Sequence, residues 1–496
     1  MSSPEGDVQP GVSPPGTTLN IALFRTTSQR FVTSSGMFAM PPQTLAARLA
    51  EYAAGLTFDK LTKEAVHETK RRFIDSFATA IGAMPSDAYA IAKKCAARVS
   101  SNPGASILAG GKSSVEWATF VNGLLIRYLD FNDTYLSKEP AHPSDNLAPV
   151  LAVGESVGAG GKDLITAAVL AYEIQCRFCD AASLRKHGID HVTYGAISSA
   201  VAAAKLMKLD ETKITHTVGL AGACNVALRQ TRSGELSMWK GCAFANAARN
   251  GVFAATLAAD GMTGPAPIFE GDLGFFKLVA REAFTPAPFG SDPGNADGFM
   301  INKTYIKFWP AEYHSQSAID AALQLRAELN GDVSKVASID IATFEASYSI
   351  IGKYPEAWAP KTRETADHSL PYCTAAALHD GDVYLESFDE AHFTNPKLVA
   401  FTGKVKVRHD ATLDPRYPTG IPNRITVTLT DGRTLVREVE FPRGHAGNPM
   451  TDAEVETKFR RVAEPRYGRA KADEILARCW DLEKLTSVTD LIALFG

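Results

Sequence analysis

Residues 242–261 read CAFANAARNGVFAATLAADG, and this stretch best indicates the fold. Small side chains recur through it at helical spacing, which lets the backbones of neighbouring helices approach closely. Two more alanine-rich stretches, ITAAVLAYEIQ (165–175) and GAISSAVAAAKLMKL (195–209), have the same character. Upstream, apolar residues at intervals of three and four predict amphipathic helices over 45–56 and 66–81. The sequence therefore predicts a mostly helical domain.

The pattern changes near residue 300, where β-branched residues begin to alternate with polar ones. Examples are SKVASIDIATFEA (334–346) and RITVTLTDGRTLVREVEF (424–441). Such alternation predicts strands, and Asp431-Gly432 between two alternating runs predicts a hairpin. This part of the chain should therefore form an α+β region.

Helical pattern returns after the hairpin, since Thr451 and Glu454 stand at the spacing of a capping box. We therefore expect a mostly α fold with an inserted α+β domain. The predicted parts are a large all-helical domain formed by 37–303 plus 441–496, and a smaller lid domain formed by 304–440. The cleft between two such domains is the expected place for a ligand.

Composition indicates a soluble globular protein. The 496 residues include 45% hydrophobic and 21% charged residues, and the formal net charge of −4 offers no basic field for nucleic acid. Apolar runs fall short of the roughly 20 residues of a membrane span. Seven scattered cysteines indicate a reducing compartment. We expect a cytoplasmic protein that binds neither nucleic acid nor membrane.

Residues 1–36 differ from the rest of the chain. They are rich in Ser and Thr, and no acid stands between Asp7 and Glu51. This composition is typical of an organellar presequence, but a disordered tail or a mis-assigned start codon explains it equally well. A presequence would place the protein in the mitochondrial matrix.

The loop over 129–146, LDFNDTYLSKEPAHPSDN, has the composition expected of a catalytic loop. It follows an apolar helical run and carries Asp130, Thr134 and His142 out of the core. Prolines on each side of His142 restrict the backbone, so the imidazole is held by a stiff segment.

Four further positions could carry chemistry, each with a plainer alternative. His191, or the nearby His187, precedes an alanine-rich helix and would lie at its N-terminus, or else act as a surface histidine. Lys240 has apolar neighbours, unlike a typical surface lysine, though a solvated charged face is the alternative. Lys307 stands among aromatic residues, though a strand lysine pointing to water is the alternative. Tyr372 is either a proton donor or a packing residue.

Together these residues suit a ligand with more than one carboxylate, since lysines and arginines accompany proton donors and acceptors. The sequence has neither a cysteine set for an iron–sulfur cluster nor an HExxH motif. Glycine-rich phosphate-loop patterns are incomplete. We therefore expect acid–base chemistry without a metal or another cofactor.

Four motifs then reveal a resemblance. They are the 129–146 loop, LRQTRSGELSMWKGCAFANAARNG (228–251), KFWPAEYHSQSA (307–318) and HSLPYCTAAAL (368–378). In order and spacing they resemble the MmgE/PrpD family, which includes 2-methylcitrate dehydratases, cis-aconitate decarboxylases and iminodisuccinate epimerases. The resemblance implies a helical domain with an inserted lid, and a homodimer.

The resemblance also implies site residues. The matching positions are Asp130, His142, His191 and Tyr372 for catalysis, and Thr134, Lys240 and Lys307 for binding the substrate. His142 would act as base or acid. Asn132 and the HPSDN ending favour the dehydratase branch, hence dehydration of 2-methylcitrate or a related tricarboxylate. Decarboxylation of cis-aconitate, epimerisation of an iminodicarboxylate, and a binding protein without activity are the alternatives.

Overall fold

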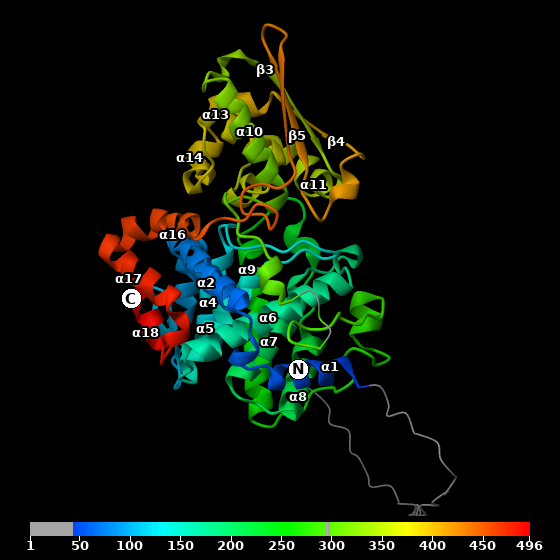
Figure 1. Cartoon of the computed structure of the whole chain (residues 1–496), viewed down its shortest axis with the longest axis vertical. Helices are drawn as coiled ribbons and strands as arrows, with labels where there is room; N and C mark the ends of the chain where they lie inside the picture. Colours follow the sequence, from blue (N-terminus) through cyan, green and yellow to red (C-terminus); the bar gives the residue numbers. More distant parts are fainter. Residues whose placement is uncertain (1–42, 294, 296–297) are drawn as a thin grey trace, which may run out of the picture. The chain divides into compact units, whose positions relative to one another are not determined.

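The computed structural model describes residues 43–293, 295 and 298–496, so the predicted tail over 1–36 lies outside the described residues. Over these ranges the chain is mostly helical with a small mixed sheet (Figure 1). None of the helices that the structure describes is long and apolar enough to cross a membrane.

Long helices form the first part of the described chain and pack side by side (Figure 1). They are α1 (Leu45–Gly55), α2 (Lys63–Ala83), α3 (Asp87–Ala96), α4 (Val115–Arg127), α5 (Leu147–Ser156), α6 (Gly161–Ala181), α7 (Val192–Leu206), α8 (Glu211–Cys224) and α9 (Trp239–Ala259). A short hairpin of β1 (Ala105–Ile107) and β2 (Gly111–Ser113) precedes α4. The helices predicted over 45–56 and 66–81 are confirmed as α1 and α2.

Small residues do bring helices together as the sequence predicts. At Gly195 on α7, a Cβ would lie 2.2 Å from the ring of Phe244 on α9. At Gly251 on α9, a Cβ would lie 2.6 Å from the carbonyl oxygen of Ala196 on α7. Both distances are far below van der Waals contact, so the close approach of α7 and α9 requires glycine at these positions.

The second part of the chain contains the sheet, whose strand order is β4-β3-β5-β6. β3 (Val336–Thr343) pairs parallel with β4 (Val405–His409) and antiparallel with β5 (Asn423–Leu429), which pairs antiparallel with β6 (Thr434–Val439). The predicted Asp431-Gly432 hairpin joins β5 to β6, and Gly432 has the positive φ of 89° that such turns favour.

Helices accompany this sheet (Figure 1). They are α10 (Gln316–Glu328), α11 (Glu345–Ser347), α12 (Arg363–Ala366), α13 (Leu370–Asp380), α14 (Glu390–Phe393) and α15 (Pro396–Thr402). α10 packs on β5, β6 and α13, and the apolar faces of these elements enclose one hydrophobic core.

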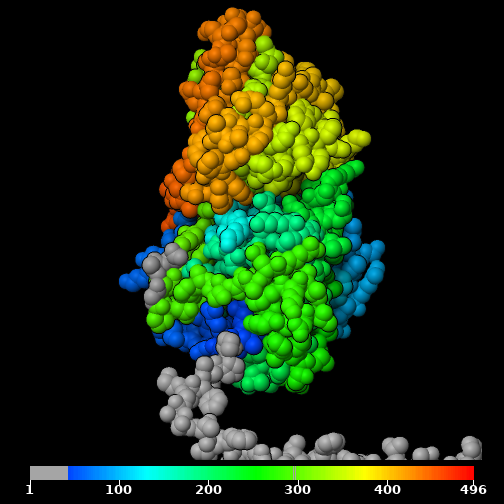
Figure 2. Space-filling model, turned by 90° about the vertical axis from the view of Figure 1, so that its right-hand side faces the viewer, coloured from blue at the N-terminus to red at the C-terminus, as the bar shows by residue number. Residues whose placement is uncertain are grey.

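The last helices are α16 (Asp452–Tyr467), α17 (Arg469–Trp480) and α18 (Thr489–Ile492). α16 begins with the predicted capping box, in which the Thr451 and Glu454 side chains each accept a hydrogen bond from the other residue's backbone N–H. Phe459 of α16 packs into the same core as Phe73 and Phe77 of α2. The C-terminal helices thus share the core of the first helices, while the segment between encloses its own core. Figure 2 shows that segment, in yellow and orange, gathered apart from the blue and green first helices.

A backbone bridge ties the loop after α4 to the segment that leads toward the sheet. Thr134 N–H donates to the Tyr305 carbonyl over 2.9 Å, and Tyr305 N–H donates to the Thr134 carbonyl over 2.8 Å. This bridge brings the polar loop predicted over 129–146 beside Lys307.

Candidate active site

A cavity with about 980 Å³ of empty space, part of it open to solvent, lies where these two segments meet. Five of the sequence-predicted residues line it: Asp130, Thr134, His142, His191 and Lys307. Further walls come from the loop after α8 and from the residues around α11 and α12. The structure therefore gathers most of the predicted site.

Asp130 is the electrostatic centre of the site. Its Oδ1 lies 2.6 Å from both Arg127 Nη1 and Lys307 Nζ, and its Oδ2 lies 3.1 Å from Lys240 Nζ. Lys307 also donates to the Asp130 carbonyl over 2.9 Å. Asp130 has a φ of 50°, a left-handed conformation that aspartate tolerates better than most residues.

These cations decide the charge of Asp130. Burial alone would raise the pKa of this carboxyl, but Arg127, Lys240 and Lys307 together hold it well below its usual value. Asp130 is therefore a permanent carboxylate that orders its neighbours, and it is too weak a base to take a proton from carbon.

Lys240 lies beneath Asp130 and not on the cavity wall. Its side chain is fully buried, and its second carboxylate neighbour is Asp367 at 3.7 Å. Burial lowers the pKa of Lys240, whereas Asp130 and Asp367 raise it. The role of Lys240 in binding a ligand stays a prediction, while in the structure its ammonium group contacts Asp130.

His142 presents an unprotonated nitrogen to the cavity. Its Nδ1 lies 2.8 Å from the Asp133 carbonyl, which only accepts hydrogen bonds, so Nδ1 carries the proton and Nε2 keeps its lone pair. Burial, then Arg127 and Lys307, hold the pKa of His142 well below 6.5. His142 is therefore a neutral imidazole poised to accept a proton.

The backbone around His142 is held firmly. Asp133 accepts hydrogen bonds from Ser144 N–H at 2.9 Å and from the Tyr172 hydroxyl at 2.8 Å. The Thr134 hydroxyl donates to the Ala141 carbonyl over 3.1 Å, which closes the loop in front of His142. The stiffness predicted from the two prolines is thus reinforced by hydrogen bonds.

His191 immediately precedes α7, as the sequence predicts, and its ring centre lies 5.8 Å from that of His142. Burial lowers the pKa of His191 to about 3, although Asp190 opposes the shift. Its buried Nδ1 has no hydrogen-bond partner among the described residues. The alternative, His187, does not line the cavity.

Tyr372, which the sequence predicts to be catalytic, is not among the residues that line the cavity. It lies in the first turn of α13 with 1% of its surface exposed, and its hydroxyl donates to the Ser387 carbonyl and lies 2.9 Å from His392 Nδ1. It packs in the core of the sheet and does not line the cavity, whereas Tyr354 does.

Several cavity residues escaped the residue-by-residue prediction: Arg127, Arg229, Arg232, Glu312, His314 and His368. Arg127 is the one charged residue in the apolar run before the loop, and this could have marked it as a site residue. The two arginines and His368 stand in motifs that the sequence analysis had already marked.

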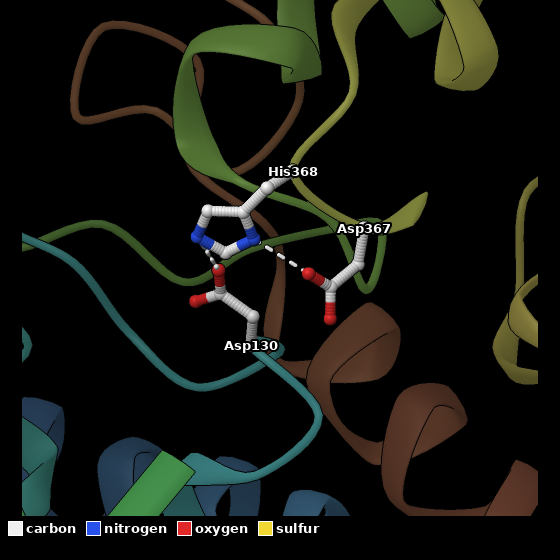
Figure 3. Close-up of side chains that lie close together, drawn as sticks. All are labelled: Asp130, Asp367 and His368. Atoms are coloured by element: carbon white, nitrogen blue, oxygen red, sulfur yellow. Dashed lines mark hydrogen bonds and ion pairs between the residues drawn. The ribbon is translucent and has the colours of Figure 1, made fainter. Parts of the chain in front are cut away.

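His368 lies between two carboxylates (Figure 3). Its Nδ1 is 2.5 Å from Asp367 Oδ1, and its Nε2 is 3.3 Å from Asp130 Oδ2. Potential metal-binding atoms of these three residues lie within 4.8 Å of one another. They fit a divalent cation poorly, because three cationic side chains already surround Asp130.

Replacing Asp130 should unfold the site as well as inactivate it. Asp130→Asn tolerates the same backbone conformation but leaves Arg127, Lys240 and Lys307 without their shared carboxylate. We expect the free energy of unfolding to fall by about 3–5 kcal/mol in urea titrations. Adding Lys240→Met should restore part of it. Unchanged stability in Asp130→Asn would contradict this account.

Comparisons with known proteins identify the family of the chain. The MmgE/PrpD N-terminal domain matches residues 47–286, and the MmgE/PrpD C-terminal domain matches residues 309–482. A 2-methylcitrate dehydratase of Cupriavidus necator is 31% identical over 75% of this chain and 80% of its own length.

Two fungal relatives are similar. The mitochondrial 2-methylcitrate dehydratase of Yarrowia lipolytica is 29% identical over 72% of this chain and 71% of its own length. Alkylcitrate dehydratase phiI of a fungal species is 31% identical over 70% of this chain and 73% of its own length. The chain thus belongs to the MmgE/PrpD family, as one of its dehydratases, which are hydro-lyases.

Proposed function

We propose that the protein dehydrates 2-methylcitrate, or a closely related tricarboxylate, to 2-methyl-cis-aconitate by acid–base catalysis. The observation that carries the proposal is His142, a neutral imidazole whose Nε2 faces a cavity with cationic side chains on its walls. The names of the relatives support the choice of substrate.

Three cationic side chains are free to bind carboxylates. Arg232 donates to Asp190 over 2.8 Å through Nε, while its buried Nη2 has no hydrogen-bond partner among the described residues. Arg229 lines the same wall. Lys307 donates two hydrogen bonds to Asp130, and its third N–H remains for a ligand. Arginine and lysine at these places suit a substrate with several carboxylates.

The reaction requires a base and an acid. His142 Nε2 takes the proton from the carbon next to a carboxylate, and the C–H electrons form the new double bond. The C–O bond breaks, and the hydroxyl leaves as water after it receives a proton. Charge that builds on the carboxylate is stabilised by Lys307 and the arginines.

His368 is our proposed acid, in place of Tyr372. Both of its ring nitrogens face carboxylates, which only accept hydrogen bonds when ionised, so the imidazolium form satisfies both contacts. His142 meets a carbonyl and cations instead. Two histidines in opposite environments are suited to opposite roles.

The neutral state of His142 predicts a pH dependence. Because its pKa is depressed, the base stays unprotonated as the pH falls through 6.5, so kcat/KM should decline only at markedly lower pH. His142→Asn keeps a donor for the Asp133 carbonyl and should lower kcat by about 100-fold or more. His187→Asn is the matched control. A decline centred near 6.5 would contradict the assignment.

A panel of acids tests the reaction itself. The purified protein is offered 2-methylcitrate, citrate, cis-aconitate and iminodisuccinate, and products are identified by NMR. We expect loss of water from 2-methylcitrate, absent in His142→Asn. Carbon dioxide from cis-aconitate would instead indicate a decarboxylase, and inverted iminodisuccinate an epimerase. Citrate-induced stabilisation without any product would indicate a binding protein.

An apolar wall favours a second candidate, a citrate with a longer alkyl group at carbon 2. Leu136 and Tyr313 line the cavity and belong to one hydrophobic cluster, against which Ile350 of the cavity wall also packs. These residues come from other segments than the arginine loop after α8, so the cavity offers a ligand apolar contacts as well as charged ones. The alkylcitrate dehydratase relative supports adding 2-alkylcitrates to the panel.

We also propose the domain division predicted from sequence, with 304–440 as a lid over the helical domain formed by 37–303 and 441–496. The two separate hydrophobic cores support it. The cavity takes residues from both, which a lid requires.

A homodimer is proposed through α9 and its surroundings. Trp239 and Phe253 on α9 are 48% and 54% exposed, and they lie on one face of the helix because fourteen residues make nearly four turns. Leu228 and Met238 nearby are also exposed. Exposed apolar groups of this kind mark interfaces. Light scattering should give twice the chain mass, and Trp239→Glu with Phe253→Glu should give the monomer mass.

A further inference from the structure

Lys458 of α16 is a buried cation outside the cavity that touches both segments of the site. Its Nζ lies 2.6 Å from Asp75 Oδ1 on α2. It donates to the Phe131 carbonyl over 2.7 Å and to the Lys307 carbonyl over 2.9 Å. The ammonium also lies 3.5 Å above the centre of the Phe131 ring. The ammonium therefore makes one ion pair and donates to two backbone carbonyls.

We propose that the Lys458–Asp75 ion pair positions Asp130 and Lys307 for catalysis. Phe131 directly follows Asp130, so the first carbonyl contact fixes the residue at the electrostatic centre. The second fixes the backbone of the lysine whose side chain meets that same carboxylate at 2.6 Å. One buried ammonium thus sets the distance between two segments that are far apart in sequence.

A neighbouring residue on α2 acts on the same two segments. Arg72, one turn before Asp75, donates to the Thr304 hydroxyl over 3.0 Å and to the Thr304 carbonyl over 2.9 Å. Its Nε also lies 3.5 Å from Asp133 Oδ2. Two charged residues of α2 therefore contact both segments of the site. Arg72 contacts them directly, and Asp75 does so through Lys458.

Stability alone does not account for this pair. A buried ion pair loses much of its attraction to desolvation, and apolar side chains of similar size often replace such pairs without loss of stability. An apolar pair has no donor for the Phe131 and Lys307 carbonyls. The two roles can therefore be separated by mutation.

The decisive variant is Asp75→Leu with Lys458→Met. We expect it to fold and to melt above Lys458→Met alone, because no buried charge is left unpaired, although the Phe131 and Lys307 carbonyls lose their donor. Its kcat for the substrate found in the panel should fall by about 100-fold, the cost of a small misplacement of reacting groups. Lys458→Met alone should lose both activity and more stability, because Asp75 is left unpaired. Wild-type kcat in the folded double variant would overturn the proposal.

Two additions keep the test decisive. Lys70→Met removes another link from α2 to the C-terminal part, the 2.7 Å pair with Glu483, which touches neither site segment, so kcat should not change. Should the double variant not fold, Lys458→Met, which also removes the donor to both carbonyls, is assayed per folded molecule, judged by circular dichroism. Wild-type kcat in that variant would equally overturn the proposal.

The inference rests on the proposed dehydration, so binding is measured as well. The dissociation constant for citrate, measured by calorimetry, should rise about tenfold in the double variant, because Lys307 is displaced. If the wild type dehydrates none of the acids, the proposed function fails, yet the citrate measurement still decides the positioning role. Unchanged citrate affinity in the double variant would then overturn it.

Discussion

One buried carboxylate, that of Asp130, organises the site. It meets Arg127 from the end of α4, Lys240 from the start of α9, and Lys307 from the segment that leads to the sheet. Three cations this close would repel one another strongly at such depth. Each cation is attracted to the carboxylate of Asp130, and this attraction offsets the repulsion among the three. Asp130 thus holds together three parts of the chain that are distant in sequence.

The same charges explain how the cavity can both bind anions and hold a neutral base. Asp130 is shared by three cationic neighbours, and two of them, Arg127 and Lys307, also line the cavity. These two cations suit a polycarboxylate and disfavour a proton on His142, whose pKa is held low by burial and then by Arg127 and Lys307. Substrate binding and the basicity of His142 thus follow from one charge distribution.

The sequence predicted features that depend on local pattern. Spacing of small residues indicated the packed helices, Asp431-Gly432 indicated the hairpin, and the polar loop around His142 indicated the site. Such patterns do not fix the direction in which a side chain points. Tyr372 follows His368 by four residues, but His368 precedes the N-cap of α13 and faces the cavity, while Tyr372 lies inside the helix and faces the core.

The contacts also constrain how a lid could move. Tyr305 and Lys307 are tied to the loop after α4 by the backbone bridge, by Asp130 and by Lys458, so they must stay with the helical core. The hinge of the proposed lid therefore has to lie beyond Lys307, a few residues after its predicted boundary at 304. Opening would separate His368 from Asp130, a contact of 3.3 Å, and leave the Lys307 contact intact. Closure would then bring the proposed acid to a site where the base and the carboxylate-binding groups of the helical part already stand, so that water loss could begin only in the closed state.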